Sequence, residues 1–232
     1  MADNPGTSRV EIVSATRFSQ AEFAARSALG QSLLRLAFDD RLTAALAFAN
    51  RTCLPAVFNA RIIASAPVEI LVFMHDDVWI DDHFFVDRVI DGLRHFDVIG
   101  VAGNRRRVPR QPAWSFVNAD LHWDELCNLS GWVAHGAQPA GTVYKFGAVP
   151  AECELLDGIL LAVRKSALLA HHLLFDERFD FHFYDVDFCR AARQAGLRLG
   201  TWPIAITHQS GGSFGSVAWL RNYVAYLAKW GN

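Results

Sequence analysis

The sequence carries almost no net charge. Its 22 basic and 24 acidic residues leave a formal charge of -2, so there is no bulk positive field to hold nucleic acid or an anionic membrane. This balance excludes a general polyanion-binding protein. Any contact with phosphate has to be made by a few local groups.

Long hydrophobic runs are also absent. The strongest apolar stretches, residues 70–74 and 158–163, are far shorter than the roughly 20 residues that a membrane-spanning helix needs. Residues 1–6 lack the basic start and apolar stretch of a secretory signal. We therefore expect a cytoplasmic protein without a transmembrane segment, and contact with the inner face of the membrane stays open.

The four cysteines form no Cys-x-x-Cys pair, which favours free thiols over a zinc site or a disulfide framework. No internal repeat or low-complexity tract is present. The composition is 52% hydrophobic and 20% charged, as is typical of a folded globular protein. A length of 232 residues suits one large domain or two small ones.

Strand and helix patterns alternate along the first hundred residues. The strand-like segments are 9–16, 42–48, 68–74 and 97–102. One helical segment begins at Ser19, which has a capping box, and two others cover 54–64 and 81–96. This alternation predicts a parallel, doubly wound sheet with helices on both sides. Ligands in such sheets bind at the carboxyl ends of the strands.

The pattern changes in the second half of the chain. Residues 104–138 are irregular and contain Trp114, Trp123 and Trp132, and a long irregular segment is often a binding loop. Short strands follow over 142–164 and 204–208, with helices at 184–195 and 216–230. The aromatic stripe of the last helix is expected to pack on the sheet rather than on a membrane.

Polar residues follow the most apolar strand. Side chains alternate along a strand, so His75 and Asp77 should point one way and Asp76 the other unless the chain turns there. Paired carboxylates at a strand end suit a hard divalent cation that also binds substrate phosphates. A turn or a helix cap is the alternative interpretation.

A second acidic pair, Asp185 and Asp187, falls at the start of a predicted helix. The two side chains lie about 200° apart around the helix, so they cannot share one role. A helix N-terminus favours the ionised carboxylate, which can accept a proton. Plain N-capping is the alternative.

Two further strand ends carry polar residues. His208 precedes the glycine-rich loop 211–215, and an imidazole combined with oxygen ligands suits Mn²⁺ better than Mg²⁺. A structural histidine is the alternative. Asp157 and Gly158 interrupt apolar strands, which marks either a contact with a hydroxylated ligand or a hairpin turn.

In this order, the segments resemble the GT-A-fold glycosyltransferases, specifically the bacterial family 2-like branch. Residues 73–78 are similar to the variant Asp-x-Asp motif of this branch, in which His replaces the first acid. Its central and catalytic segments are similar to residues 156–158, 175–177 and 181–189. His208 is similar to its late metal ligand. The resemblance spans about residues 10–215. The chain departs from it at His75, where an acid is common, and at Tyr184, where Glu often precedes the catalytic Asp.

The resemblance implies a GT-A-type, Rossmann-like α/β fold, with a mainly parallel central sheet flanked by helices and a smaller second sheet on the acceptor side. We expect a single domain over 1–232, with a nucleotide-sugar half at 9–103, an acceptor and catalytic half at 104–215, and a C-terminal helix at 216–230.

It further implies an inverting, metal-dependent transfer of a hexosyl-type sugar from a nucleotide diphosphate sugar, UDP-sugar foremost, to a hydroxyl of a glycan or lipid-linked acceptor. Mn²⁺ or Mg²⁺ is the expected cofactor, and bacterial surface polysaccharide synthesis is the expected setting.

Site roles carried over from the resemblance are these: Asp185 as general base, and Asp187 as alternative base or acceptor-orienting group; Ser14, Thr16, Asn59, Arg61 and Asp76 at the nucleotide sugar; Asp157, Gly158, Trp132 and His182 at the acceptor; Asp77, His208 and Asp76 at the metal. Trp114 and Trp123 are further candidates for stacking on sugars.

Two other functions remain open. A sugar nucleotidyltransferase normally has a glycine-rich phosphate loop after the first strand, and residues 14–18 contain no glycine. A non-catalytic glycan-binding or scaffold domain derived from a transferase is compatible with His75 and Tyr184. Donor hydrolysis with and without Mn²⁺ distinguishes this second alternative from an enzyme.

Overall fold

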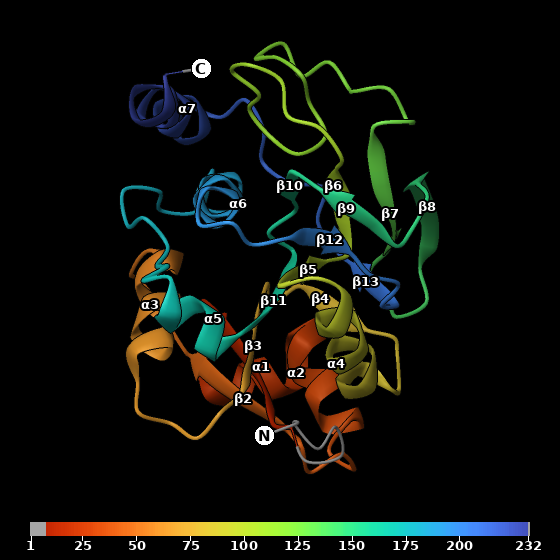
Figure 1. The fold of residues 1–232 in the computed structure, drawn as a ribbon. Helices are drawn as coiled ribbons and strands as arrows, with labels where there is room; N and C mark the ends of the chain where they lie inside the picture. The colour runs from red at the N-terminus through yellow and green to blue at the C-terminus, as the bar shows by residue number, and fades with distance from the viewer. Residues whose placement is uncertain (1–7, 232) are drawn as a thin grey trace.

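Two β-sheets meet near the centre of the molecule, as Figure 1 shows for the computed structural model, which describes residues 8–231. The first sheet has seven strands in the order β2 (Leu42–Ala47), β1 (Val10–Ala15), β3 (Ile70–Met74), β11 (Leu160–Arg164), β5 (Val98–Gly100), β12 (Leu199–Thr201) and β9 (Ala151–Cys153). Strands β1, β2 and β3 are parallel as predicted, whereas β11 runs antiparallel to both neighbours. The expectation of a mainly parallel sheet is therefore wrong in part, because the sheet is mixed: β12 is parallel to β5 but antiparallel to β9.

The second sheet runs in the order β10 (Leu155–Leu156), β6 (Ala102–Asn104), β7 (Leu129–His135), β13 (Ile206–His208) and β4 (Val78–Ile80), and β8 (Thr142–Gly147) pairs with β7. The predicted arrangement of a central sheet, flanking helices and a smaller second sheet is confirmed. Strand β13 is parallel to β7 and antiparallel to β4, so the end of the second half of the chain lies beside a strand of the first half.

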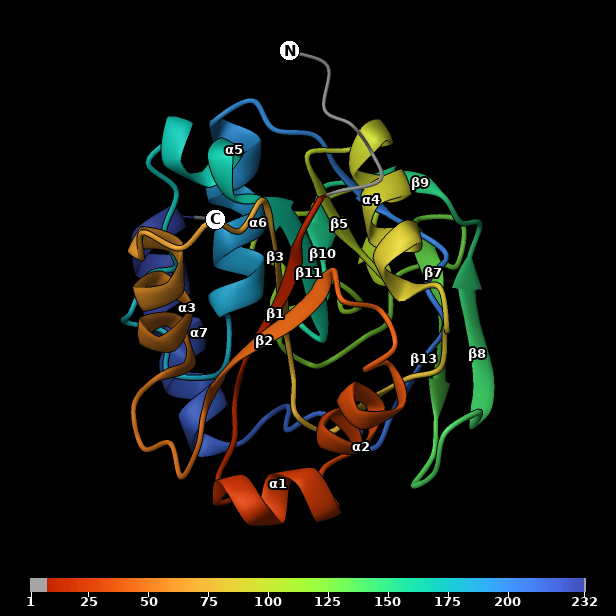
Figure 2. The same cartoon turned by 90° about the horizontal axis from the view of Figure 1, so that it is seen from below.

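Seven helices surround the sheets in the described part of the chain: α1 (Gln20–Arg26), α2 (Ala28–Arg35), α3 (Leu54–Ile63), α4 (Phe85–His95), α5 (Lys165–Ala170), α6 (Tyr184–Gln194) and α7 (Val217–Trp230). In Figure 2, α3, α5 and α6 lie on one side of the first sheet and α4 lies on the other. The predicted helices at 54–64, 184–195 and 216–230 are confirmed to within a residue or two, as is the capping box at Ser19.

The predicted start of the fourth helix is wrong. Asp81 and Asp82 do not begin α4, which starts only at Phe85. Asp81 instead accepts hydrogen bonds from the Thr207 hydroxyl at 2.6 Å and from the Ala140 backbone N–H at 3.1 Å. These tertiary partners hold the acid in a connection to the second sheet.

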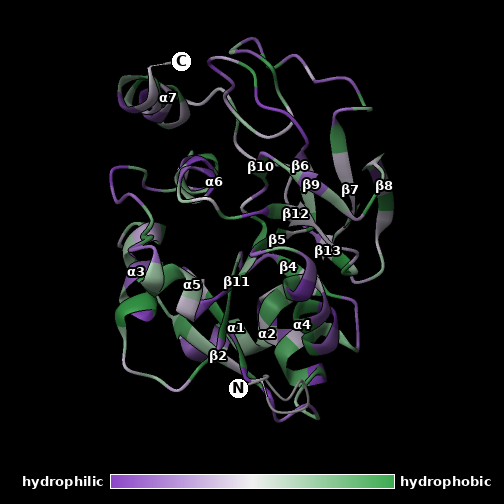
Figure 3. Ribbon diagram, viewed as in Figure 1, coloured by the Kyte–Doolittle hydropathy of each residue, from purple (hydrophilic) through white to green (hydrophobic). Residues whose placement is uncertain are grey.

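The core is centred on β3, whose five residues are all buried. Helices cover both faces of the sheet around it, and Figure 3 shows β3 and β11 mostly in the hydrophobic colour. Burying each such side chain contributes roughly 1.5–3 kcal/mol. This buried strand ends at Met74, directly before the polar residues that the sequence singled out.

The last helix packs through its aromatic stripe, but its ring partner is Phe183, just before α6, rather than the sheet on which we expected it to pack. Trp219, Tyr223 and Tyr226 are buried, and their rings contact the ring of Phe183. Across residues 8–231, no helix has the length and apolar character needed to cross a membrane. Residues 1–6, whose pattern entered the expectation of a cytoplasmic protein, lie outside the described range.

Candidate functional site

A large cavity opens where the chain passes from one sheet to the other. Strand β3 belongs to the first sheet and β4 to the second, and residues 75–77 form the turn between them. The cavity has a volume of about 1140 Å³ and is lined by residues of both halves of the chain. It lies at the carboxyl ends of β1 and β3, where ligands bind in open α/β sheets.

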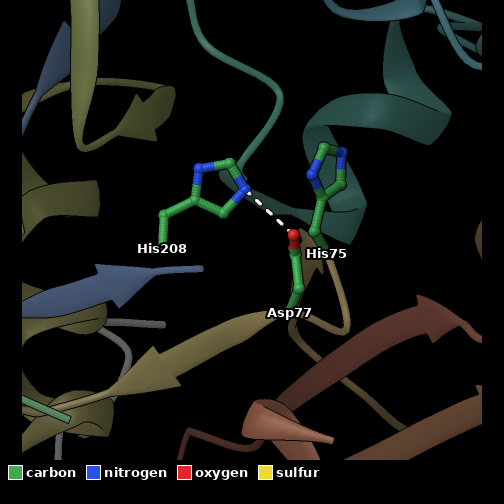
Figure 4. Close-up of side chains that lie close together, drawn as sticks. All are labelled: His75, Asp77 and His208. Atoms are coloured by element: carbon green, nitrogen blue, oxygen red, sulfur yellow. Dashed lines mark ion pairs between the residues drawn. The ribbon is translucent and has the colours of Figure 1, made fainter. Parts of the chain in front are cut away.

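Two side chains of this turn and one of β13 form a cluster of metal-ligating type. His75, Asp77 and His208 each present a ligand atom, and these atoms lie within 4.8 Å of one another. The antiparallel pairing of His208 with Val78 brings β13 alongside the turn, so Nε2 of His208 lies 3.3 Å from Oδ2 of Asp77. Figure 4 shows the three side chains facing one another.

The protonation states of His75 and Asp77 suit the binding of a cation. Burial lowers the pKa of His75, which keeps the imidazole neutral at neutral pH. Burial alone would raise the pKa of Asp77, but hydrogen bonds from His208 and Ser210 contribute to holding it well below its usual range. Neutral imidazole and ionised carboxylate are the forms that bind metals. Two nitrogens and one carboxylate are a suitable donor set for Mn²⁺.

The structure brings His75 rather than Asp76 into this cluster. Asp76 lines the cavity beside Thr16, and its backbone carbonyl accepts a hydrogen bond from the Leu29 N–H at 3.1 Å. Burial raises the pKa of Asp76, an effect that hydrogen bonding to Thr16 opposes. Residues 75–77 lie in a turn, which is the exception that the sequence analysis left open, and all three line the cavity.

Three of the residues predicted at the nucleotide are not among the cavity-lining residues of the described chain. Ser14 is buried in β1. Asn59 donates a hydrogen bond to the Phe175 carbonyl at 2.9 Å, and Arg61 forms an ion pair with buried Glu11. The cavity end beyond β1 and β2 is instead lined by polar residues that sequence reasoning missed: Arg17, Asn50, Arg51 and Thr52.

Asp185 lies in the first turn of α6 and lines the cavity. Phe183, just before the helix, has a φ of 68°, a left-handed conformation that is uncommon for residues other than glycine. The Gly158 backbone N–H donates to Oδ2 of Asp185 at 3.1 Å. Burial, assisted by the negative charge of Asp157, raises the pKa of Asp185 to about 7. A carboxyl with this pKa is suited to general-base chemistry at neutral pH.

Asp187, the second acid of the pair, points elsewhere. Its carboxylate accepts hydrogen bonds from Lys229 Nζ at 2.9 Å and from Trp230 Nε1 at 2.8 Å, both on α7. Asp187 is not one of the described residues that line the cavity. The separation of roles expected from the helical spacing is therefore present, with one acid at the cavity and one anchoring the last helix.

An aromatic wall forms part of the lining of the cavity. Its members are Trp114, Phe116, Trp123, Phe146 and Phe214, which contact one another in edge-to-face or stacked pairs. Buried Trp114 donates its Nε1–H to Oδ2 of Asp157 at 2.5 Å. Trp123 is 55% exposed, so part of its surface is open to a ligand.

Of the four residues predicted at the acceptor, three line the cavity and one does not. Asp157, Gly158 and His182 line the cavity, whereas Trp132 does not appear among its described lining residues. Trp132 lies on β7, where Nζ of Lys145 sits 4.6 Å from its ring centroid. His135 was missed by sequence reasoning. It lines the cavity because β7 pairs with β13, and its ring lies 5.7 Å from that of His208.

Comparison with solved structures shows the fold. GalNAc-T7 with UDP, GalNAc and Mn²⁺ is similar with a TM-score of 0.55 and 10% identity, over 97% of this chain and 48% of that chain. A197 from STIV (TM-score 0.49, 11% identity, 83% and 81% covered) and the catalytic domain of Drosophila beta1,4galactosyltransferase 7 complexed with xylobiose (0.45, 12%, 84% and 64%) are more distant. The chain thus spans about half of the GalNAc-T7 structure.

Sequence comparison supplies the family. No curated protein sequence matches the chain significantly. A family profile described as a glycosyltransferase-like family matches residues 49–210, a stretch that includes His75, Asp77, Asp185 and His208. Because the match covers more than half of the chain and the fold is of the GT-A type, the chain belongs to this glycosyltransferase-like family.

Proposed function

We propose that the chain is a metal-dependent, inverting glycosyltransferase that moves a hexosyl-type sugar from a nucleotide diphosphate sugar, UDP-sugar foremost, to an acceptor hydroxyl. The observation that carries the proposal is that Asp185, with a pKa of about 7, lines the same cavity as the cluster of His75, Asp77 and His208. A base and a cation site in one cavity are what this reaction needs.

The donor diphosphate is proposed to bind beside the cluster. When bound by His75, Asp77 and His208, Mn²⁺ or Mg²⁺ would act as a Lewis acid that stabilises the charge developing on the diphosphate oxygens. Arg17 and Arg51 line the cavity end next to Thr16. Their guanidinium groups supply positive charge for the nucleotide part of the donor, in a chain without a bulk positive field.

Asp185 is proposed to take the proton from the acceptor hydroxyl. As the proton moves to the carboxylate, the acceptor oxygen forms a bond to the anomeric carbon from the face opposite the leaving group. The bond between that carbon and the phosphate oxygen breaks, the electron pair leaves with the nucleotide diphosphate, and the configuration inverts. A general base of this kind contributes typically about 10²–10⁴-fold.

The acceptor is proposed to be a glycan or a lipid-linked sugar. The aromatic wall offers ring faces, and Asp157 offers a carboxylate that is held by Trp114 and acts electrostatically on Asp185. Flat rings and a fixed acceptor atom are suited to a ligand with apolar CH faces and hydroxyl groups. The resemblance to the bacterial family 2-like branch supports surface polysaccharide synthesis at the cytoplasmic side as the setting.

The test is a transfer assay with a panel of nucleotide diphosphate sugars, simple glycan acceptors and Mn²⁺. We expect one donor to give product, with the anomeric configuration inverted by NMR, and chelation of the cation to abolish turnover. Asp185→Asn should lose at least about 10²-fold in turnover while donor binding is retained.

Other outcomes identify other functions. Near-normal turnover of Asp185→Asn contradicts the base assignment, and retained configuration contradicts inversion. Glycan binding without donor hydrolysis, with or without Mn²⁺, indicates a non-catalytic domain. Release of inorganic diphosphate from a nucleoside triphosphate and a sugar phosphate indicates a nucleotidyltransferase.

A further inference from the structure

The hydroxyl of Tyr184 lies between a metal-cluster histidine and a backbone carbonyl. Its oxygen is 2.9 Å from Nε2 of His75 and 2.9 Å from the carbonyl oxygen of Gly158. Tyr184 is almost fully buried, so bulk water does not compete for these contacts. The two positions at which the chain departs from the glycosyltransferase pattern, His75 and Tyr184, are therefore in direct contact.

The single hydroxyl proton determines the direction of both hydrogen bonds. The Gly158 carbonyl can only accept, so the Tyr184 O–H donates to it. The Tyr184 oxygen then accepts from His75, which requires the proton of the neutral imidazole to be on Nε2. The reverse arrangement would leave the buried Gly158 carbonyl without this partner, which is unfavourable.

A proton on Nε2 leaves the lone pair of His75 on Nδ1. In Figure 4 the ring nitrogen next to the point of attachment faces the side of Asp77 and His208, and the other nitrogen points away from them. The hydrogen bond to Tyr184 thus directs the free lone pair into the cluster. Metal-binding histidines generally donate the second N–H to a partner that fixes tautomer and ring orientation.

We propose that Tyr184 is a positioning residue for the cation, because it holds His75 as the Nε2–H tautomer and makes Nδ1 the metal ligand. This inference rests on the proposed metal dependence of the enzyme. The proposal gives buried Tyr184 a function in metal binding that is separate from proton transfer and from acceptor binding.

Gly158 connects the Tyr184–His75 pair to the proposed base, Asp185. Its carbonyl accepts from Tyr184 while its N–H donates to Oδ2 of Asp185. A Cβ atom at this position would lie 2.4 Å from the Tyr184 hydroxyl oxygen, so only glycine allows the close approach. The orientation of a metal ligand and that of the base are therefore fixed by one residue.

The first test measures the tautomer directly. Two-bond ¹H–¹⁵N NMR spectra of the full-length, metal-free protein should show His75 as the Nε2–H tautomer, assigned with His75→Gln. In Tyr184→Phe the preference should be lost or reduced. A dominant Nδ1–H tautomer in the wild-type protein would overturn the proposal, whether or not the protein transfers sugar.

The second test measures Mn²⁺ affinity by titration followed with electron paramagnetic resonance. Tyr184→Phe should bind Mn²⁺ about 10- to 100-fold more weakly. Tyr223→Phe is the matched control, since Tyr223 also donates from a buried position to a carbonyl, that of Arg110 at 2.7 Å, but on α7 and outside the cavity-lining set. Its Mn²⁺ affinity should equal that of the wild type.

A pair of His75 variants tests the same proposal if Tyr184→Phe does not fold. The amide oxygen of Asn can approximate Nδ1 of histidine, and that of Gln approximates Nε2, so His75→Asn should retain more Mn²⁺ affinity than His75→Gln. Equal affinities of folded Tyr184→Phe and wild type, or the reverse order of the His75 variants, would overturn the proposal and leave the transferase assignment standing. Failure of the wild type to bind Mn²⁺ would overturn both this proposal and metal dependence.

Discussion

The carboxyl of Asp185 titrates under the influence of a second cavity acid, Asp157. Burial is the main cause that raises the pKa of Asp185 to about 7, and the negative charge of Asp157 raises it further. Hydrogen bonds from the backbone N–H groups of Val186 and Gly158 oppose both effects. The pKa of the base is therefore set by burial, by one neighbouring charge and by backbone hydrogen bonds, and of these the charge of Asp157 can be removed by mutation.

This relationship predicts the pH dependence of the reaction. A carboxyl with a raised pKa is protonated below pH 7, and a protonated carboxyl cannot accept the acceptor's proton. We expect kcat/KM to rise with pH through a midpoint of about 7. In Asp157→Asn the neighbouring charge is gone, so the midpoint should move to lower pH. Rates measured from about pH 5 to about pH 9 with saturating Mn²⁺ check both statements.

A matched variant separates this local effect from a general loss of charge. Asp187→Asn also removes one carboxylate from the same helix as Asp185, but that carboxylate contacts Lys229 and Trp230 instead. Its midpoint should stay near that of the wild type. A wild-type midpoint near the ordinary pKa of aspartate, or an upward shift in Asp157→Asn, would contradict the assignment of Asp185.

Gly158 should tolerate no side chain. A Cβ atom there would lie 2.4 Å from the hydroxyl oxygen of Tyr184 and 3.0 Å from Cβ of Asp185. Because both neighbours are held by packing, Gly158→Ala should lower the free energy of unfolding by about 1–3 kcal/mol and reduce both Mn²⁺ affinity and turnover. Denaturant unfolding and the transfer assay measure these changes.

Gly211 provides the control for this substitution. It also lines the cavity, yet a Cβ atom there would meet no atom within 4 Å. Gly211→Ala should leave the free energy of unfolding near the wild-type value. Equal stability of the two alanine variants would show that Tyr184 can move away without cost.

Much of the fold could be predicted because local patterns and tertiary structure agree. The apolar run of β3 is buried on both faces, and the Ser19 capping box begins α1 as expected. The start of α4 could not be predicted, since an acid such as Asp81 is a good helix cap and only the folded chain brings Thr207 to it. The antiparallel insertion of β11 into the first sheet is likewise a property of long-range pairing.

In the site, too, some residues could be predicted from the sequence and others could not. Residues at strand ends, such as Asp77, Asp157 and His208, line the cavity because strand ends converge there. Helical residues were less predictable, since a single sequence does not determine which face of α3 meets β1. Arg61 therefore pairs with Glu11 rather than facing the cavity.

The two acids of α6 should have opposite effects on stability and turnover. Burial raises the pKa of Asp187 as well, but Asp187→Asn also turns an amide N–H toward the donors Lys229 and Trp230. Because these donors then lack an acceptor, the free energy of unfolding should fall by about 1–3 kcal/mol, while turnover per folded molecule stays near normal. Asp185→Asn should abolish most turnover.

The stability of Asp185→Asn should depend on pH in a defined direction. The folded-state pKa of Asp185 is raised, so ionisation of the wild-type carboxyl costs folding stability as pH rises from the unfolded value toward 7. The variant lacks this cost and should gain in melting temperature relative to the wild type over that range. Thermal unfolding at several pH values checks this, and loss of turnover in Asp187→Asn with normal stability would contradict the division of roles.

Two tryptophans with similar exposure should differ in their effect on acceptor binding. Trp123 is 55% exposed and lines the cavity, whereas Trp132 is 48% exposed and lies on β7 beside Lys145. Loss of a stacking ring worth about 0.5–1.5 kcal/mol should raise the acceptor KM of Trp123→Ala by about 2- to 13-fold, with the donor KM unchanged. Trp132→Ala should leave both constants near wild type. A raised acceptor KM in Trp132→Ala but not in Trp123→Ala would instead place acceptor binding at Trp132 on β7, as the sequence analysis predicted.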